Sequence, residues 1–319
     1  MRIRGIQSDR SVAQDNGSCR EEHEIGLTLN AESDIGRHYV EIRQRLDGLQ
    51  EKGRMSGEND NWKAGEAYES YMGRWSRPLA RSFIRWLAPS RGAHWLDVGC
   101  GTGALTSAIC ELADPASVLA CDPSEPFIDH ARKTVLDGRV SFAVAGAENL
   151  PNGSGALDYI VSGLVLNFVA NPGRAIARMT QRLRRMGVIA AYVWDYAEGI
   201  EFLRRFWDEA VALDSAAADL DEGRRFPICQ RDMLQMLALG AGLRHVTVDA
   251  LEIPTRFQDF KDFWTPFLRG TGPAPAYVAS LSQEQRDLLR DRLARRLTVK
   301  ADGSISLIAR AWAVSGVLE

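Results

Sequence analysis

Cysteine is scarce in this sequence, and the few cysteines are not spaced like a structural site. The chain has 5 cysteines, an odd number with no C-x-x-C pair among them. Reduced thiols in a cytoplasmic protein therefore fit better than a disulfide framework or a zinc site. No set of histidine, cysteine, aspartate and glutamate has the spacing of metal ligands, so we expect no metal.

The chain also lacks a long hydrophobic run and a strong net charge. No apolar stretch reaches the length of a membrane span, and residues 1–10 are polar and basic where a signal peptide needs an apolar core. The formal net charge of −3 gives no overall attraction to nucleic acid or acidic membranes. We expect a small-molecule partner, no nucleic acid and no membrane span; the oligomeric state stays open.

Aromatic residues are almost absent from the first part of the chain. Residues 1–55 are rich in charged residues, Gly, Ser, Asn and Gln, and contain one aromatic ring, Tyr39. Such a segment buries little surface, so we predict a mobile polar extension. Residues 56–319 are predicted to form the folded domain, with a helical N-terminal cap at 56–90 and a helical insertion at 254–300.

From residue 94 onward, apolar strand-like segments alternate with helical segments. This alternation predicts an α/β fold with right-handed βαβ units and an open parallel sheet. The expected strands are residues 94–98, 117–121, 140–145, 157–162, 188–194, 245–253 and 304–313. The expected helices between them are residues 104–112, 124–135, 172–185, 201–213 and 231–238.

Three further helices are expected in the cap and in the insertion. Ser76 and Pro78 are the residue types of an N-cap and a first helical turn, so a helix is predicted to open there. Residues 257–267 are predicted to form an aromatic helix. A Gly/Pro-rich hinge at 270–275 separates it from a helix that opens with a capping box at Ser282–Gln285.

The strongest local motif lies where the first strand meets the first helix of this alternation. Residues 96–103 read Leu-Asp-Val-Gly-Cys-Gly-Thr-Gly. The glycines permit a tight turn with positive φ and let a ligand approach the backbone. The unpaired N–H groups of the following helix suit a carboxylate or a phosphate. The loop alone predicts a nucleotide-like ligand without saying which one.

The glycine spacing and nearby acids narrow that choice. The dinucleotide fingerprint is G-x-G-x-x-G, and here the third glycine comes one residue too early. Asp97, two residues before Gly99, would repel a pyrophosphate and suits a cationic ligand. Asp122 ends the second strand, where a carboxylate can accept ribose hydroxyls. Ala147 and Glu148, after the third strand, would lie beside an adenine.

Together these motifs resemble the class I S-adenosylmethionine-dependent methyltransferases. The likeness is greatest to the small-molecule, type 11 group that includes ubiquinone- and menaquinone-biosynthesis-like enzymes. The matching stretches are residues 68–77, 96–103, 121–123, 147–151, 156–169, 187–194, 302–305 and 311–313. The chain departs from the family pattern before the fifth strand, where Arg184-Arg185-Met186-Gly187 replaces a Pro-Gly-Gly turn.

The resemblance implies a Rossmann-like, seven-stranded mixed sheet of order 3-2-1-4-5-7-6 with one antiparallel strand. It also implies S-adenosylmethionine as the cofactor and S-adenosylhomocysteine as the product. Asp97 would face the ammonium side of the cofactor, and Arg74 would lie near its carboxylate. The implied cofactor contacts are Tyr71, Arg74, Asp97, Gly99, Cys100, Gly101, Gly103, Asp122, Pro123, Ala147, Glu148, Gly163 and Leu164.

A sulfonium methyl group is already electrophilic, so the protein need only hold a nucleophile in line and exclude water. A general base is needed only for a protonated nucleophile. The candidate bases are Asp195 and Tyr196, directly after the fifth strand. Trp194, Phe260 and Trp264 are expected to line a pocket for a flat or apolar acceptor, with core packing as the alternative. The acceptor atom, oxygen, nitrogen or carbon, stays open.

Two other function classes remain in view. One is an NAD-dependent oxidoreductase, which the glycine spacing and Asp97 disfavour. The other is a non-catalytic S-adenosylmethionine-binding protein, or a subunit that needs a partner. The intact glycine loop argues against lost cofactor binding but says nothing about turnover.

Overall fold

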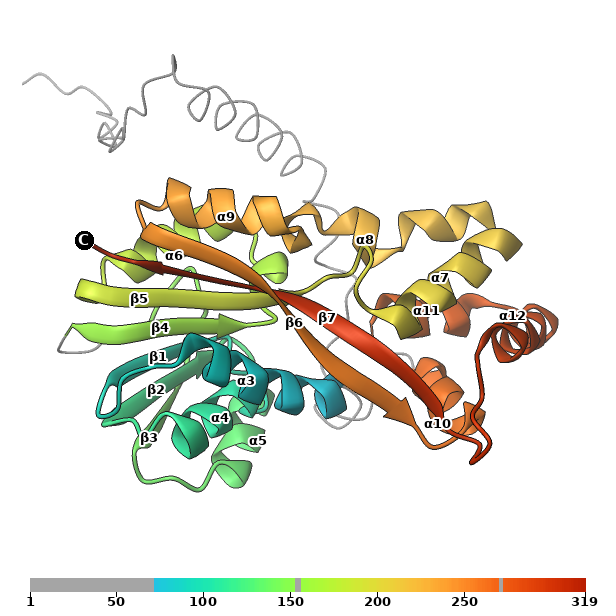
Figure 1. Ribbon diagram of the computed structural model, residues 1–319, viewed down its shortest axis with the longest axis horizontal. Helices are drawn as coiled ribbons and strands as arrows, with labels where there is room; N and C mark the ends of the chain where they lie inside the picture. The colour runs from blue at the N-terminus through green and yellow to red at the C-terminus, as the bar shows by residue number, and fades with distance from the viewer. Residues whose placement is uncertain (1–71, 153–155, 270–271) are drawn as a thin grey trace, which may run out of the picture. The chain divides into compact units, whose positions relative to one another are not determined.

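The computed structural model describes residues 72–152, 156–269 and 272–319. The predicted extension at 1–55 and the cap residue Tyr71 lie outside the described residues. The described residues build one sheet of seven strands in the order β3-β2-β1-β4-β5-β7-β6 (Figure 1). The strands are β1 (His94–Val98), β2 (Ser117–Asp122), β3 (Val140–Val144), β4 (Leu157–Gly163), β5 (Leu183–Trp194), β6 (Arg244–Phe257) and β7 (Ile305–Val317).

The pairing of the strands confirms the predicted fold class and strand order. Neighbouring strands from β3 to β5 pair in parallel. β7 runs antiparallel to both β5 and β6. The carboxyl ends of β1, β2 and β4 therefore meet at one edge of the sheet, which is where open α/β sheets bind ligands.

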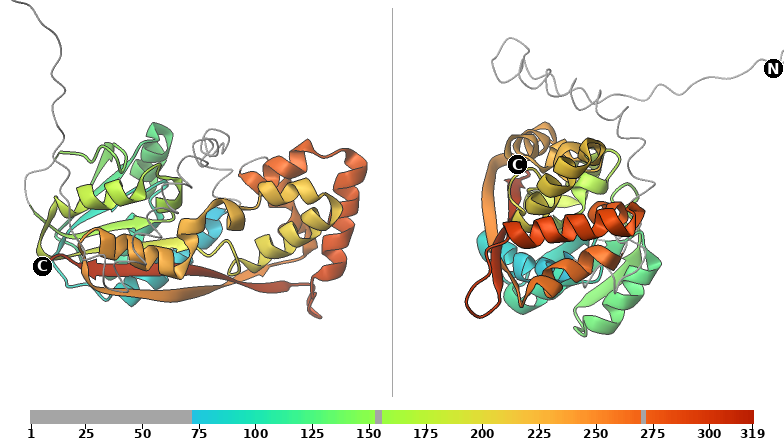
Figure 2. Two further views of the ribbon diagram at one scale, coloured as in Figure 1. Left: turned by 90° about the horizontal axis from the view of Figure 1, so that it is seen from above. Right: turned by 90° about the vertical axis from the view of Figure 1, so that its right-hand side faces the viewer.

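Helices cover both faces of the sheet (Figures 1 and 2). α3 packs against α4 on one face, and α6 packs against α9 on the other. The α-helices are α3 (Arg74–Leu87), α4 (Ala104–Leu112), α5 (Glu125–Thr134), α6 (Pro172–Thr180), α7 (Glu201–Leu213), α8 (Glu222–Arg225), α9 (Arg231–Gly240), α10 (Phe260–Trp264), α11 (Pro273–Ser280) and α12 (Gln283–Arg296). The 3-10 turns are η2 (Leu166–Phe168), η3 (Ser215–Asp219), η4 (Pro227–Cys229) and η5 (Thr265–Arg269).

The prediction that Ser76 is the N-cap of α3 was wrong by three residues. α3 begins at Arg74, its N-cap is Gly73, and Pro78 lies inside the helix. Ser76 is buried, and its hydroxyl donates to the Met72 carbonyl at 3.2 Å. Tertiary contacts extend the helix backward, because Arg74 pairs with Asp262 of the insertion.

The predicted boundary between α6 and β5 was also wrong. α6 ends at Thr180, five residues early, and β5 starts at Leu183, where a helix was expected to continue. Leu183 pairs with Leu157 across the sheet, and the Arg184 Nε lies 2.7 Å from the Asp158 carboxylate. Sheet pairing here overrides the helical propensity of an arginine-rich stretch.

The β6–β7 hairpin is longer than predicted and carries the insertion at its far end (Figure 1). Phe257 is the last residue of β6 and not the first of an aromatic helix, because it pairs with Ile305. The prolines at the predicted hinge instead fall in the first turn of α11, where a missing N–H costs little. The Ser282–Gln285 capping box is present as predicted.

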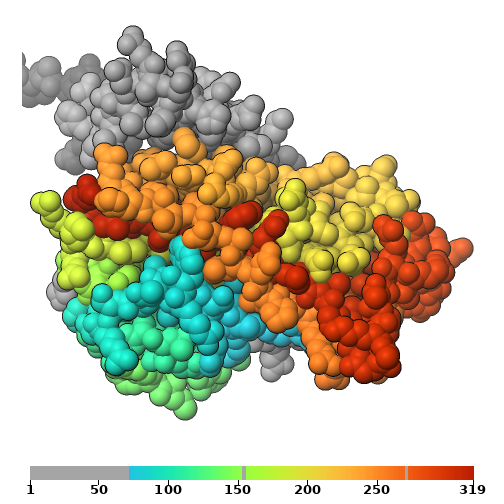
Figure 3. All heavy atoms as spheres, in the orientation of Figure 1, coloured from blue at the N-terminus to red at the C-terminus, as the bar shows by residue number. Residues whose placement is uncertain are grey.

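α7 and the helices of the insertion form one aromatic-cored lobe, defined as α7, α10, η5, α11 and α12. Phe206 of α7 stacks on Phe267 with ring centroids 4.6 Å apart. Phe206 also contacts Tyr277, with ring centroids 6.3 Å apart. Figure 3 shows α12 residues beside those of α7 on one face of the molecule. None of the described helices is long and apolar enough to cross a membrane.

Candidate active site

The glycine loop between β1 and α4 is bonded to the end of β2. The N–H groups of Gly99 and Cys100 both donate to the Cys121 carbonyl, at 2.7 and 2.9 Å. Gly103 donates to Cys100 within the loop at 2.9 Å. All three glycines have positive φ, at 76° for Gly99, 53° for Gly101 and 91° for Gly103, a region that other residues rarely adopt.

The three glycines differ in what a side chain would meet. A Cβ on Gly99 would lie 2.5 Å from a methyl group of Val165, and one on Gly103 would lie 2.6 Å from Val135. A Cβ on Gly101 would meet nothing within 4 Å. Gly99 and Gly103 are therefore required for packing, whereas Gly101 leaves its backbone open to a ligand.

Asp97 lies fully buried at the end of β1, directly below this loop. The Thr106 hydroxyl donates to its Oδ2 at 2.6 Å, while its Oδ1 has no hydrogen-bond partner among the described residues. Burial raises the pKa of the carboxyl to about 7, against the smaller lowering effect of the Thr106 hydrogen bond. A buried oxygen without a donor is unfavourable, so the site fits a cationic ligand group.

Asp122 ends β2 as predicted and faces the same loop. Its Oδ2 accepts from the Gly101 N–H at 3.0 Å and its Oδ1 from the Ser124 N–H at 2.8 Å. Burial raises the pKa of this carboxyl, and the two backbone hydrogen bonds oppose the rise. Each carboxylate oxygen can accept a second hydrogen bond, so the group retains capacity for ribose hydroxyls.

The segment predicted to flank an adenine follows β3 beside Asp122. The Ala145 N–H donates to the Asp122 carbonyl at 3.1 Å, and a Cβ on Gly146 would lie 3.7 Å from Pro123. Ala147 is buried and Glu148 is exposed. The structure thus brings Pro123 and the start of this segment together, and their contacts with an adenine stay predictions.

Gly163 and Leu164 close the site at the end of β4. A Cβ on Gly163 would lie 2.5 Å from the Tyr192 hydroxyl oxygen, so only glycine fits under that ring. Leu164 has a φ of 63° and donates its N–H to the Tyr192 carbonyl at 2.8 Å. The Ser162 hydroxyl donates to the Val98 carbonyl at 2.9 Å and fixes β4 beside the glycine loop.

The thiols around the loop are not arranged as nucleophiles. Cys100 and Cys121 are both buried. Burial is the largest cause that raises the pKa of each thiol, to about 12 for Cys121. Both thiols are protonated at neutral pH, and the predicted role of Cys100 in lining the cofactor stays a prediction.

Arg74 has a partner that the sequence did not reveal. Its guanidinium bonds the Asp262 carboxylate at 2.8 and 3.2 Å and stacks 4.5 Å from the Trp75 ring centroid. This ion pair ties the start of α3 to the insertion. The predicted contact of Arg74 with the cofactor carboxylate is not among these interactions and stays a prediction, as does that of Tyr71, which lies outside the described residues.

Asp195 follows β5, but donors already occupy its carboxylate. Arg310 donates from Nε to Oδ2 at 2.8 Å, and the Glu198 N–H donates to Oδ1 at 3.1 Å. This geometry favours an anchor for the β5–α7 connection over the predicted general base. Tyr196 is buried beside Phe226, with ring centroids 5.6 Å apart.

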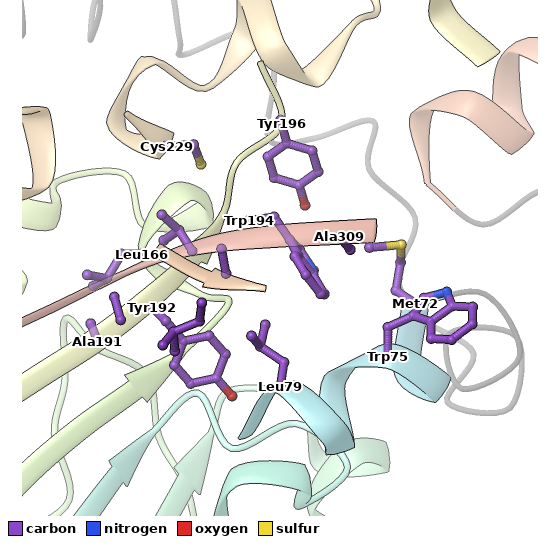
Figure 4. Packing of buried hydrophobic residues seen from close by; sticks show 14 of the residues in the cluster. Met72, Trp75, Leu79, Leu166, Ala191, Tyr192, Trp194, Tyr196, Cys229 and Ala309 are labelled. Atoms are coloured by element: carbon purple, nitrogen blue, oxygen red, sulfur yellow. The ribbon is translucent and has the colours of Figure 1, made fainter. Parts of the chain in front are cut away.

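The three predicted acceptor-pocket aromatics come from two separate elements, β5 and α10. Trp194 is buried at the end of β5, where Figure 4 shows it with Leu166, Tyr196 and Cys229 around the chain as it leaves the strand. Phe260 and Trp264 lie on α10 and contact Phe263 and Phe267 inside the lobe. Packing therefore accounts for the contacts of Phe260 and Trp264, and their role toward an acceptor stays a prediction.

A cleft of about 440 Å³ lies to one side of this site, between α7 and α8. Its lining includes Ala197, Trp207 and Gly223. The charged pair in it, Arg204 and Asp221, is joined by a hydrogen bond of 2.8 Å from Nη1 to Oδ2. None of its described lining residues belongs to the glycine loop, so we assign it no part in cofactor binding.

Four residues at the site escaped prediction: Thr106, Val165, Phe168 and Phe226. Thr106 is recognisable only once Asp97 is known to be buried, because the two are nine positions apart. Val165 and Phe168 lie in the mostly apolar stretch directly after β4, just beyond Gly163 and Leu164, where the predicted contacts ended. Phe226 comes from a distant segment that carries no motif.

The fold and the site define a Rossmann-like α/β protein that binds an adenosine-type cofactor at the carboxyl ends of β1 and β2. Comparison with protein families agrees, since residues 96–191 match the family described as methyltransferase domain. The chain thus carries a class I S-adenosylmethionine-dependent methyltransferase domain. The predicted family and cofactor are thereby confirmed.

Individual relatives are similar over different parts of the chain. The chain is 27% identical over 241 residues to a trans-aconitate 2-methyltransferase of Delftia acidovorans, covering 72% of this chain and 88% of that protein. It is 29% identical over 148 residues, 45% of its length, to the uncharacterized protein syc1184_c of a Synechococcus strain. The chain spans only 35% and 37% of the length of two of the curated relatives that it matches.

Among solved structures, the fold is similar to a phosphoethanolamine N-methyltransferase 2 of Haemonchus contortus in complex with S-adenosylmethionine. The sequence identity is 16% and the TM-score 0.48, with 85% of this chain and 60% of that one covered.

Proposed function

We propose that the protein transfers a methyl group from S-adenosylmethionine to a small-molecule acceptor by in-line displacement. One observation carries the proposal: the buried Asp97 Oδ1 has no donor in the part of the chain that the structure describes, and the space at the Cβ position of Gly101 is open. A cofactor with an ammonium group fits the unpaired oxygen, whereas a pyrophosphate would be repelled by it.

Each residue of the site has a stated part in that function. Asp97 holds the ammonium side of the cofactor, and Asp122 accepts from its ribose hydroxyls. The cofactor, held by these residues, would supply an electrophilic methyl group for attack by an electron pair of the acceptor. Gly163 and Leu164 position the β4 end of the site and help to exclude water. Holding the acceptor in line supplies about 7–11 kcal/mol of the barrier.

A titration separates this proposal from an NAD-dependent oxidoreductase. Isothermal calorimetry with S-adenosylhomocysteine and with NADH is expected to show binding of the first ligand alone. Tight binding of NADH, with no heat from S-adenosylhomocysteine, would contradict the cofactor assignment.

A turnover assay addresses the non-catalytic alternative. Incubation with methyl-tritiated S-adenosylmethionine and small acceptors is expected to yield labelled product and S-adenosylhomocysteine in equal amounts. A protein that binds S-adenosylhomocysteine but forms no product from any acceptor would favour a binding protein or a subunit that needs a partner.

The setting of the reaction is also a proposal. Cys100, Cys110, Cys121 and Cys229 are unpaired thiols, as in a reducing cytoplasm. The charge balance of the chain supports a small-molecule partner and no nucleic acid.

A further inference from the structure

Asn167 is a polar residue in an otherwise apolar run after β4. It is the middle residue of η2, the turn directly beyond the carboxyl end of that strand. Its amide nitrogen Nδ2 is buried and has no hydrogen-bond partner among the described residues. More than about 90% of buried polar groups have a partner, and leaving one unpaired costs about 1–3 kcal/mol. A buried donor without a partner indicates that a bound ligand supplies the missing hydrogen-bond acceptor.

One side of the η2 turn lies against the cofactor loop. Its N-cap residue is Val165, whose methyl group occupies the space where a Cβ on Gly99 would lie, at 2.5 Å. The turn that carries Asn167 is therefore in direct contact with the loop that holds the cofactor.

On its other side, the turn contributes Phe168 to an aromatic trio. The trio is defined as Phe168, Tyr196 and Phe226. The Phe168 and Phe226 ring centroids are 5.4 Å apart, and those of Phe226 and Tyr196 are 5.6 Å apart. These rings come from the segments that follow β4, β5 and α8, beyond the carboxyl ends of the strands. A methyl acceptor must occupy this region, between the cofactor loop and the trio.

The geometry of the turn separates the directions of its three side chains. A 3-10 helix has three residues per turn, so successive side chains point about 120° apart. Leu166 is buried in the main hydrophobic core, and Phe168 contacts Phe226. Asn167 points in the third direction, away from both the core packing of Leu166 and the ring contact of Phe168.

We propose that Asn167 is an acceptor-binding residue, whose amide donates a hydrogen bond to a carboxylate or phenolate oxygen on a flat, apolar acceptor. The inference rests on the proposed function. An amide NH₂ only donates, so its partner must offer a lone pair, which an ammonium group lacks. Phe168, which is 44% exposed and packs on the buried Phe226, supplies an aromatic surface against which a flat apolar body packs.

The surroundings of Asn167 also favour an acceptor that arrives ionised. The described histidines lie elsewhere: His94 starts β1, His130 is in α5 and His245 is in β6. Of the two predicted bases, Asp195 is held by Arg310, whereas Tyr196 belongs to the trio and would be needed as a base only for a protonated acceptor. A carboxylate or phenolate needs no proton removed before it reacts.

The test compares wild type with Asn167→Leu, using benzoate and 4-nitrophenol as oxygen probes and benzylamine as the amine probe. We expect methyl transfer to an oxygen probe, a KM for that probe raised roughly 10- to 100-fold by Asn167→Leu, and an unchanged Kd for S-adenosylhomocysteine. The control is Asn152→Leu, at an exposed asparagine, which is expected to leave both constants unchanged.

Thermal unfolding tests whether Asn167 has only a structural role, because loss of such a role would lower the melting temperature. Because Nδ2 has no described protein partner, Asn167→Leu and the smaller Asn167→Ala are expected to keep the melting temperature within a few degrees. A large drop in both variants, or an equal loss of S-adenosylhomocysteine affinity, would overturn the inference. So would transfer to benzylamine alone, or to no probe, by a wild type that binds S-adenosylhomocysteine. A wild type that does not bind S-adenosylhomocysteine would instead overturn the proposed function.

Discussion

At the scale of single residues, Gly101 offers a way to separate backbone strain from ligand contact. Gly101→Ala places a Cβ in open space at a φ of 53°, which costs about 1–2 kcal/mol for a non-glycine residue. The new methyl group also lies on the surface that we assign to the cofactor. We expect a modest loss of stability and at least a tenfold loss of S-adenosylhomocysteine affinity, measured by thermal unfolding and calorimetry.

Gly92 provides the matched control. It has a φ of 69° and equally open space around its Cβ position, but it precedes β1 at the opposite end of the strand. Gly92→Ala is expected to lose similar stability and to bind S-adenosylhomocysteine normally. Equal affinities for the two variants would remove Gly101 from the cofactor site.

Asp97 predicts a dependence of stability on pH. Its pKa of about 7 in the folded protein exceeds the ordinary carboxyl pKa of 3.8 because burial disfavours the charged form. The folded state therefore binds more protons between these values, so this group's contribution to stability is complete below about pH 4 and is lost as pH rises toward 7. The loss is on the order of 4 kcal/mol.

Asp97→Asn removes this titration and tests it. Denaturant unfolding from pH 5 to 8 is expected to show the variant gaining stability relative to wild type as pH rises. Its S-adenosylhomocysteine affinity should fall about tenfold or more, because a charged partner for the ammonium is lost. A difference in stability that stays constant across this pH range would contradict the assignment.

At the scale of elements, α7 and α12 are joined through a buried acid. Glu209 is 5% exposed, and its carboxylate lies 2.6 Å from Arg292 Nε and 2.9 Å from Arg296 Nε. Both arginines are partly exposed, so water can hydrate their guanidinium groups when the Glu209 carboxylate is removed. We expect Glu209→Ala to cost about 1–2 kcal/mol, well below the full penalty of a buried pair, and to lower the melting temperature by a few degrees.

Asp208→Ala on the same helix is the control, because Asp208 is exposed. Calorimetry should give both variants the wild-type affinity for S-adenosylhomocysteine, since none of the residues that we assign to the cofactor lies in the lobe. If S-adenosylhomocysteine affinity fell in Glu209→Ala but not in Asp208→Ala, the packing of the lobe would be shown to affect the cofactor site.

Elements set by local pattern were predictable from the sequence, whereas those set by tertiary pairing were not. β1 and α4 have their predicted bounds because an apolar run, three glycines and an amphipathic segment define them. Phe257 was predicted to be helical, yet the long β6–β7 pairing makes it a strand residue. In the site, Asp97 and Asp122 were predictable from their motif positions. The unpaired amide of Asn167 was not, because burial and the lack of a partner appear only in three dimensions.

At the scale of the whole molecule, one ion pair spans 188 positions of the sequence, from Arg74 at the start of α3 to Asp262 in α10. Both side chains are partly exposed, at 30% and 26%, so the pair contributes at most about 1 kcal/mol. Nearby donors lower the pKa of Asp262, first of all Arg74. Such a weak link is easily exchanged for another partner, and the cofactor carboxylate is the partner that the family resemblance implies for Arg74.

Hydrogen exchange with and without S-adenosylhomocysteine distinguishes these two states of the molecule. If Arg74 keeps Asp262, the ligand should slow exchange in the glycine loop and after β2 and β4, and leave residues 256–264 unchanged. If Arg74 moves to the cofactor, Asp262 loses a partner, and exchange in residues 256–264 should become faster on binding. Since the first pattern follows from the contacts in the structure, it is the one we expect. Arg74→Gln should then leave S-adenosylhomocysteine affinity within twofold of wild type, and a tenfold loss would assign Arg74 to the cofactor.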